Sequence, residues 1–276
     1  MITGATSLIA HIGYPTHSFK SPMIYNPYFE SKGIDTIVVP MGCQVPDYPA
    51  FLKSVFTLTN IVGALITMPH KVTTVGLLDE MTPTVEIAGA CNAVRRTPDG
   101  RLQGDMFDGE GFVRGIRRKG FDPKGKSALV VGSGGVGSAI AASLAAAGVT
   151  RLDLFDTNTS SSSGLAERIK KHYPIEVNVG HKDPAGMDLV VNATPMGMEA
   201  GDPLPVNVSR IDAHTFVGEV VMRAEMTEFL KQVSARGCSV QVGTDMLFEQ
   251  IPAYLEYFGY PTTTAEELRS VAKLSY

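Results

Sequence analysis

The sequence is poor in the residues that mark disulfide-rich, metal-binding and nucleic-acid-binding proteins. Only three of its 276 residues are cysteines and no CxxC pair occurs, so we expect neither a disulfide framework nor a zinc site, and a reducing compartment fits. Six histidines include no HExxH pattern, and we expect no metal. Lysine and arginine form no dense run beyond residues 114–120, and the formal net charge is −4. Both features argue against nucleic acid as a partner.

A charged leader and long apolar segments are also missing. Residues 1–13, "MITGATSLIAHIG", lack the basic start of a secretory signal, and no apolar run is long enough to cross a bilayer. With 44% hydrophobic and 19% charged residues, the chain is able to bury the core of one large or two ordinary domains. We therefore expect a soluble, cytoplasmic protein with no membrane partner.

Short apolar runs alternate with helix-like stretches in the first half of the chain. Strands are expected at 7–13, 35–42 and 60–69, with helices at 21–33 and 46–58 between them. Strands separated by helices predict βαβ units and a mainly parallel sheet, and thus an α/β fold.

A hairpin interrupts this rhythm. Alternating residues in 92–108 flank the turn sequence "TPDGR", which predicts two antiparallel strands. A helix is expected next, at 109–121, and the polar segment 122–126 is a candidate domain boundary.

A second α/β alternation starts at Ser127. It ends in the two most helix-like stretches of the chain, at 246–259 and 262–274, the latter with a threonine and glutamate start signal. The four serines at 160–163 are interpreted as a flexible surface loop.

A dinucleotide-binding pattern opens this second half. Residues 128–148, "ALVVGSGGVGSAIAASLAAAG", combine a strand, a GxGxxG sequence and a helix of small residues. Gly132 permits the tight turn, Gly134 lets the backbone approach a pyrophosphate, and Gly137 allows close packing of helix and strand. The helix N-terminus offers its N–H groups to the phosphates. The predicted cofactor-binding residues of this loop are Gly132, Gly134, Gly135, Val136 and Gly137.

An acidic residue follows at the end of the next predicted strand. Asp156 lies about twenty residues beyond Gly137, the spacing of a carboxylate that hydrogen-bonds the ribose 2′-OH of NAD. An NADP site would favour a cation here, and the chain has no further arginine until Arg168. NAD is therefore the favoured cofactor and NADP the alternative. Asp156 as an ordinary turn residue is the competing interpretation.

An apolar run in the first half ends on a lysine. Pro69 ends the strand in "GALITMPHKVT" because it lacks an N–H group for the sheet. Lys71 therefore lies at the carboxyl end of that strand, where open α/β sheets bind ligands.

Seven motifs follow one another in the order found in the shikimate dehydrogenase family, which the chain resembles over nearly its whole length. They are "GYPTHSFKSPMIYN" (13–26), "ITMPHK" (66–71), "GACNA" (89–93), "GDMFDGEGF" (104–112), "GSGGVGSA" (132–139), "NATPMGM" (192–198) and "GTDMLFEQ" (243–250). The resemblance implies a substrate-binding α/β domain of residues 1–108 and 246–276, whose last helices return to it. It also implies a Rossmann NAD(P)-binding domain of residues 109–245.

The resemblance also implies an activity. Family members transfer a hydride reversibly between a nicotinamide and a ring acid such as shikimate or quinate, and the positions of Lys71 and Asp108 form their catalytic pair. The chemistry agrees, because oxidation of a secondary alcohol requires removal of the hydroxyl proton. A lysine accepts that proton when its surroundings disfavour the ammonium form. A helix N-cap is the alternative role for Asp108.

Other positions match ligand contacts of the family. The implied substrate contacts are Ser21, Thr67, Asn92 and Gln250, and the implied cofactor contacts are Asn192, Ala193 and Thr194. Local alternatives remain open: a helix cap for the serine, turn residues for the threonine and asparagine, and an exposed helix position for the glutamine.

Several positions that are polar in the family are apolar here. They are Phe19, Leu65, Ala93, Met106, Phe107 and Met222, and a proline of the family is Ala224. A one-residue shift would use Ser18 in place of Phe19. The losses predict poorer recognition of shikimate's polar groups, so quinate or a less hydroxylated or aromatic-substituted ring acid is expected to be preferred. Tyr14, Lys20 or Arg223 are alternative sources of contacts.

Two classes of function therefore stay open. The first is a dehydrogenase acting on a small ring acid, as a monomer or homodimer. The second is a dinucleotide-binding regulatory module of the same fold that retains little catalysis. The retained Lys71 and Asp108 favour the first, whereas the altered recognition motifs favour the second.

Overall fold

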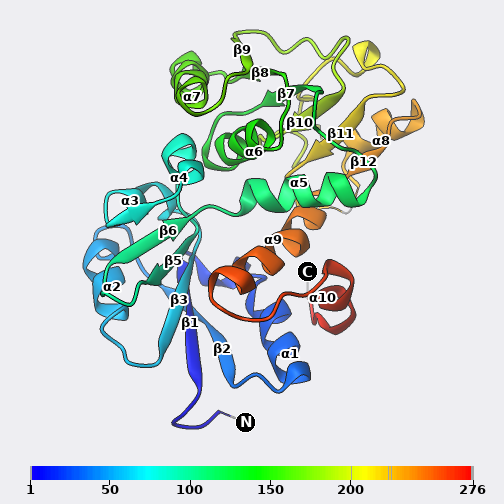
Figure 1. The fold of residues 1–276 in the computed structure, drawn as a ribbon. Coiled ribbons are helices and arrows are strands. Elements are labelled where there is room, and N and C mark those ends of the chain that lie inside the picture. Colours follow the sequence, from blue (N-terminus) through cyan, green and yellow to red (C-terminus); the bar gives the residue numbers. More distant parts are fainter. Residues whose placement is uncertain (1, 200, 223, 225, 275–276) are drawn as a thin grey trace. The chain divides into compact units, whose positions relative to one another are not determined.

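The computed structural model describes residues 2–199, 201–222, 224 and 226–274. The chain divides into two compact units. The first consists of Met1–Val85, Gly89–Phe107 and Ile251–Tyr276, and the second of Glu86–Ala88 and Asp108–Gln250. Each unit is built around its own six-stranded sheet (Figure 1). Two helices, α4 (Pro83–Ala88) and α9 (Gly243–Tyr257), continue along the chain from one unit into the other.

The first unit contains a sheet with the strand order β2-β1-β3-β5-β6-β4. Its strands are β1 (Ser7–Gly13), β2 (Thr36–Gly42), β3 (Ile61–Ile66), β4 (Glu80–Met81), β5 (Ala93–Arg96) and β6 (Leu102–Asp105). β1 pairs in parallel with β2 and β3, while β5 and β6 form the expected antiparallel hairpin. Because β1, β2 and β3 run in one direction, their carboxyl ends share one edge of the sheet.

The first unit also contains several short helices. They are α1 (Pro22–Lys32), α2 (Tyr48–Val55), α3 (Lys71–Val75) and α10 (Ala265–Val271), with the short 3-10 helix η1 (Thr16–Ser18). α1 and α10 lie side by side (Figure 1). α1 ends at Gly33, whose φ of 65° favours glycine. α10 begins after Thr264, whose hydroxyl accepts the N–H of Glu267 at 3.2 Å, as the start signal predicted.

The second unit contains a fully parallel sheet with the strand order β12-β11-β10-β7-β8-β9. Its strands are β7 (Ser127–Val131), β8 (Arg151–Phe155), β9 (Glu176–Val179), β10 (Leu189–Asn192), β11 (Phe216–Glu219) and β12 (Val240–Gln241). Its helices are α5 (Asp108–Arg118), α6 (Gly135–Ala146), α7 (Thr159–His172), α8 (Glu228–Ala235) and the 3-10 helix η2 (Val208–Arg210).

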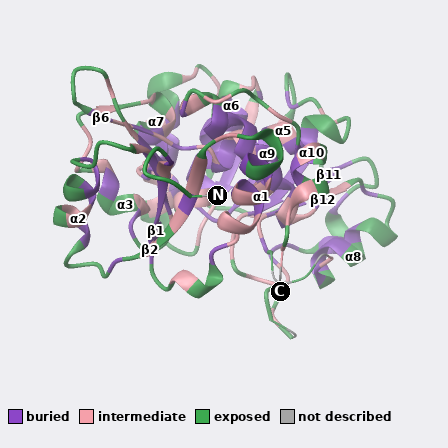
Figure 2. Ribbon diagram, turned by 90° about the horizontal axis from the view of Figure 1, so that it is seen from below, coloured by how far each residue is buried: buried purple, intermediate pink, exposed green. Residues whose placement is uncertain are grey.

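Alternate residues of β7 serve two hydrophobic cores. Ala128 and Val130 belong to a cluster that contains the apolar side chains of α6. Leu129 belongs to a second cluster with Phe229 and Leu230 of α8. The strand is therefore apolar throughout because both of its faces are buried. Buried residues concentrate on the central strands and on α6 (Figure 2). The predicted α/β fold, with two mainly parallel sheets, is confirmed.

Two local predictions are wrong. Residues 160–163 are not a loop but the first turn of α7, where Asn158 Oδ1 accepts the Ser160 N–H at 3.1 Å and Ser162 is buried. The N-cap and the apolar face at Leu165 and Ile169 outweigh the low helix propensity of serine. The segment 122–126 is not a boundary, because it lies inside the second unit.

Candidate functional site

The glycine-rich loop connects β7 to α6 in the second unit. Gly132 has a φ of +104°, and its N–H donates to Phe155 O at 2.7 Å. A Cβ on Gly137 would collide with Gly132 O, so helix and loop are in direct contact. A Cβ on Gly134 would meet no described atom within 4 Å, which leaves space above the start of α6. The loop is packed against α6 at Gly137 and leaves open space at Gly134, at the N-terminus of the helix. This arrangement fits the pyrophosphate of a dinucleotide.

Asp156 holds this loop to the end of β8. Its Oδ2 accepts the Ser133 N–H at 2.7 Å, and its Oδ1 accepts the Asn158 N–H at 2.8 Å. The interpretation of Asp156 as a turn residue is therefore correct for Oδ1, which accepts from Asn158. The other oxygen orders the loop itself. Contact of Asp156 with a ribose stays a prediction.

The "NATPM" turn lies against the same loop. Asn192 is buried, and its Oδ1 accepts from Thr194 N at 3.1 Å and Thr194 Oγ1 at 2.6 Å. Its Nδ2 donates to Met196 O at 3.0 Å. Ala193 O would be 2.7 Å from a Cβ on Gly132. The structure thus brings Ala193 and the glycine-rich loop together, while the Asn192 amide shapes the turn.

Glu219 is a buried acid that the sequence reasoning missed. It ends β11 beside Asn192, and only 1% of it is exposed. Neither carboxylate oxygen has a hydrogen-bond partner among the described residues. Burial is the dominant influence on this carboxyl group and raises the pKa of Glu219. The sequence signal that could have identified Glu219 is its position as the only charged residue of β11, at the end of that strand.

Lys71 is the first residue of α3 in the first unit. The Cys91 N–H donates to Lys71 O at 2.9 Å, which ties α3 to the segment before β5. The preceding His70 is buried, stacks on the Tyr48 ring at 3.9 Å and shares a hydrogen bond of 2.8 Å from Nε2 to Cys43 O. The backbone that carries Lys71 is therefore held on both sides.

Asn92 joins three segments of the first unit. Its N–H donates to Asp105 O at 3.0 Å, and its carbonyl accepts from Ile66 N at 2.8 Å. Its Oδ1 accepts the Phe107 N–H at 2.9 Å. The Asn92 side chain is buried, and it positions the chain directly before Asp108.

The surroundings of Ser21 test its alternative role as a helix cap. Ser21 precedes α1, but its side chain makes no capping hydrogen bond to a described residue. Ser18 is exposed, and its hydroxyl donates to Pro15 O at 3.2 Å, whereas Phe19 is buried. The structure therefore does not support a cap role for Ser21, and the alignment shift that uses Ser18 stays a prediction.

Asp108 and Gln250 belong to the second unit. Asp108 is buried in the first turn of α5, where the helix dipole favours a negative charge. The following Gly109 packs so closely that a Cβ would collide with Ala139 O of α6. Gln250 is half-buried rather than exposed, and its Oε1 has no hydrogen-bond partner among the described residues.

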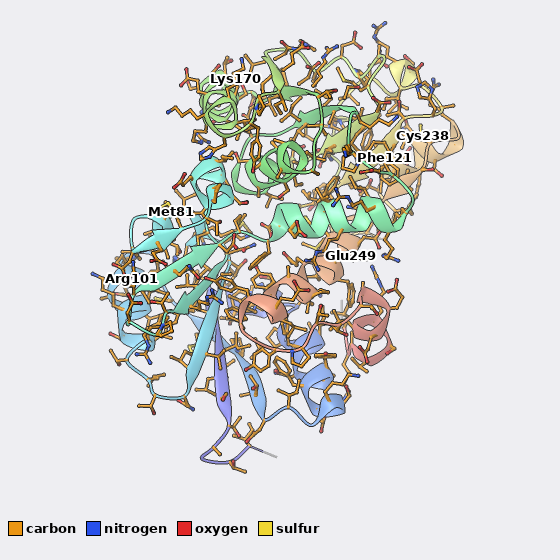
Figure 3. All side chains as sticks on the ribbon, in the orientation of Figure 1. Met81, Arg101, Phe121, Lys170, Cys238 and Glu249 are labelled. Carbon is orange, nitrogen blue, oxygen red and sulfur yellow. The ribbon has the colours of Figure 1, made fainter. Side chains whose placement is uncertain are left out.

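Ion pairs join α5 to the first half of α9. Glu249, labelled in Figure 3, pairs with Arg118, and Lys119 Nζ lies 3.1 Å from Asp245 Oδ2. Gly111 adds a close approach, since a Cβ there would lie 2.7 Å from Gln250 Cβ. These contacts fix the part of α9 that carries Gln250.

The apolar replacements are mostly interior residues. Leu65, Ala93 and Met106 are buried, and Phe107 packs edge-on against Tyr254 with 4.8 Å between ring centroids. Among the alternative contacts, Tyr14 is exposed and Lys20 is half-buried, while Arg223 lies outside the described residues.

The described part of the chain contains neither a cluster of metal-binding side chains nor a membrane-spanning helix. No group of three or more histidine, cysteine, aspartate or glutamate side chains there is arranged to hold a metal ion. No described helix is both long and apolar enough to span a membrane.

Comparison with known proteins identifies the family. A family model described as "Shikimate dehydrogenase substrate binding domain" matches residues 11–94, and one for the "ThiF family" matches residues 124–169. A shikimate dehydrogenase (NADP(+)) from Rubrobacter xylanophilus is 33% identical to this chain over 257 residues, which cover 90% of this chain and 89% of the relative. The chain belongs to the shikimate dehydrogenase family.

Solved structures resemble this member of the shikimate dehydrogenase family. Quinate dehydrogenase from Corynebacterium glutamicum in complex with NAD is 30% identical, with a TM-score of 0.86 over 96% of this chain and 98% of that one. Shikimate 5-dehydrogenase from Listeria monocytogenes, in complex with shikimate and NAD, shares the fold, with a TM-score of 0.91 over 98% and 97% of the chains at 24% identity. The predictions of family, fold class and oxidoreductase activity are confirmed.

Proposed function

We propose that this family member is a nicotinamide-dependent dehydrogenase of the shikimate and quinate type. It interconverts a cyclic hydroxy acid and its ketone by reversible hydride transfer. The observation that carries the proposal is the hydrogen bonding of one short segment. Cys91 N donates to Lys71 O, and Asn92 Oδ1 accepts the N–H of Phe107. The segment thereby orders the backbone at Lys71 and at the residue before Asp108.

Lys71 and Asp108 are assigned the proton transfer. When the substrate alcohol is oxidised, the amine of Lys71 takes up the hydroxyl proton, and the Asp108 carboxylate orients the amine and the hydroxyl. In the opposite direction the Lys71 ammonium returns a proton to the forming alkoxide. The bound nicotinamide supplies the hydride acceptor or donor.

The ring acid is held by Ser21, Thr67, Asn92 and Gln250. Asn92 is the asparagine that matches a substrate contact of the family, and its Oδ1 accepts the N–H of Phe107. Substrate binding is assigned to residues 1–108 and 246–276, and nucleotide binding to residues 109–245. The family match at 11–94 and the open glycine-rich loop support this division.

NAD is proposed as the preferred cofactor. The carboxylate of Asp156, at the end of β8, would attract a ribose hydroxyl and repel a 2′-phosphate. Gly132, Gly134, Gly135, Val136 and Gly137 would hold the pyrophosphate, with Asn192, Ala193 and Thr194 beside the nicotinamide. The Rubrobacter relative is named for NADP(+), and the Corynebacterium quinate dehydrogenase structure contains NAD. We propose NAD, as in the quinate dehydrogenase structure, because of the carboxylate of Asp156.

We also propose that the enzyme works in the cytoplasm as a monomer or homodimer. Cys43, Cys91 and Cys238 are all unpaired and buried, which suits a reducing compartment. Sedimentation of the purified chain would report its assembly state.

Turnover is measured by the absorbance of the reduced nicotinamide, with NAD and NADP in parallel against shikimate and quinate. Turnover with NAD supports the proposed reaction and cofactor, whereas turnover with NADP alone would keep the enzyme and reject the assignment of Asp156. Lys71→Ala is expected to lower kcat by about 10²–10⁴-fold while NADH binding is retained. The matched control is Lys53→Ala, an exposed lysine of the same unit. NADH binding without turnover of any ring acid would instead favour a regulatory module.

A further inference from the structure

Two aromatic rings stack where β1 and β3 end. The His11 and Phe19 ring centroids lie 4.1 Å apart, with 30° between the ring planes. Both residues are buried, with exposed fractions of 6% and 9%. Phe19 Cζ would be 3.0 Å from a Cβ on Gly13, and Thr67 Cγ2 closes the same point from the end of β3. Because Gly13 has no side chain, the Phe19 ring is able to pack directly against the backbone there.

The histidine of this stack is uncharged. Burial, and after it the charge of Lys71, lowers the pKa of His11 to about 3. The imidazole therefore carries no positive charge at neutral pH, and it does not act as a counter-ion for a carboxylate. The stack also adjoins the turn that carries Lys71, because Thr67 closes the point beside Phe19 and Thr67 O accepts the N–H of His70 at 3.0 Å.

We propose that the His11–Phe19 stack is a specificity determinant that forms an apolar wall of the substrate site and selects ring acids with few hydroxyl groups. The inference rests on the proposed function, which assigns Thr67 and Lys71 to the same site. Phe19 forms the wall, and His11 is the positioning residue that fixes the orientation of its ring.

Selection works through the loss of hydration. A substrate hydroxyl turned toward Phe19 leaves its water partners and finds no donor or acceptor on the benzene ring, which is costly. A C–H edge of the substrate ring in the same place gains apolar contact. The wall therefore discriminates against a polyhydroxylated acid by a penalty.

The test compares shikimate with 3-hydroxycyclohex-1-ene-1-carboxylate, which keeps the ring, the carboxylate and one oxidisable hydroxyl but lacks the other two. We expect the wild-type kcat/KM to be about ten-fold or more higher for the analogue. Phe19→Ser is expected to reduce this ratio by about ten-fold, because a hydroxyl partner becomes available. Phe19→Leu is the matched control, which keeps an apolar wall and the wild-type ratio. Thermal unfolding and NADH binding report whether each variant is folded.

The outcomes separate this inference from the proposed function. A wild-type ratio that favours shikimate overturns the specificity assignment without any variant. The same holds if folded Phe19→Ser keeps the wild-type ratio, or if Phe19→Leu loses selectivity as Phe19→Ser does. Failure of the wild-type protein to oxidise shikimate, quinate and the analogue with either nicotinamide would instead reject the proposed function itself.

Discussion

The side-chain oxygen of Asn92 accepts the backbone N–H of Phe107 at 2.9 Å, one residue before Asp108. The interaction links the end of β6 to the segment that also binds Lys71 O. The chain directly before Asp108 therefore depends on the geometry of a side chain that was predicted as a substrate contact, and the backbone N–H of the neighbouring Cys91 holds Lys71 O.

Replacing Asn92 by alanine is expected to lower kcat by about 10²-fold, because the Phe107 N–H loses its acceptor and Asp108 is displaced. NADH affinity should be unchanged, since the glycine-rich loop belongs to the other unit. Asn92→Asp keeps the acceptor oxygen and is expected to retain more kcat than the alanine variant. Equal kcat values in both variants would limit Asn92 to substrate contact.

Asp156→Asn is expected to weaken NADH binding and to strengthen NADPH binding relative to it. The amide keeps one acceptor but removes the negative charge that opposes a 2′-phosphate. Titration of cofactor fluorescence gives both dissociation constants, and we expect their ratio to change by about ten-fold. A parallel loss for both cofactors would assign Asp156 to loop structure alone.

His11 makes stability depend on pH in the acid range. Its folded pKa of about 3 lies below the ordinary histidine value of 6.5, so the unfolded chain binds the proton more readily. Above pH 6.5 the imidazole is neutral in both the folded and the unfolded chain, so His11 does not make the free energy of unfolding depend on pH there. The free energy of unfolding falls as the pH drops from 6.5 toward 3, because the unfolded chain gains the proton first. At pH ~5 the loss attributable to His11 is about 2 kcal/mol.

His11→Phe should remove this component while keeping a ring in the stack. Urea unfolding at neutral and acidic pH is therefore expected to show a smaller pH dependence for the variant than for the wild type. Replacement of the exposed His17 by glutamine is the control, with no change expected. A wild-type slope in His11→Phe would contradict the assigned protonation state.

Gly109→Ala is expected to destabilise the second unit by about 1–3 kcal/mol, because the new methyl group would collide with Ala139 O and force α5 away from α6. The adjacent Asp108 would move with the helix, so kcat should fall as well. Gly4→Ala has no neighbour within 4 Å among the described residues and is expected to change the unfolding free energy by less than about 0.5 kcal/mol. Thermal unfolding of the two variants provides the comparison.

The parts of the fold that follow from local pattern were predictable. The apolar strands β1, β3 and β7, the hairpin β5–β6 and the glycine-rich loop each carry their signal within a short window. β4 and β12 are only two residues long, and they exist because a neighbouring strand pairs with them. No periodicity marks such strands.

The sequence allowed us to predict which residues belong to the site, but not which contacts those residues make with one another. The sequence indicated Lys71 and Asn92, but not that Asn92 would accept from Phe107, because that bond joins residues on different strands. The stacking of His11 on Phe19 likewise depends on a turn between β1 and α1. Pairings of this kind arise from tertiary structure, which a linear pattern does not encode.

The two hydrogen bonds of Asp156 restrict how the cofactor preference of this protein is able to evolve. One carboxylate oxygen holds Ser133 in the glycine-rich loop, and the other holds Asn158. A lineage that exchanges this carboxylate for a cation gains a partner for a 2′-phosphate, but it leaves two backbone donors without their acceptor. Adaptation to NADP by this route therefore requires compensating changes in the loop or after β8, and intermediates that carry only the first substitution would bind either dinucleotide poorly.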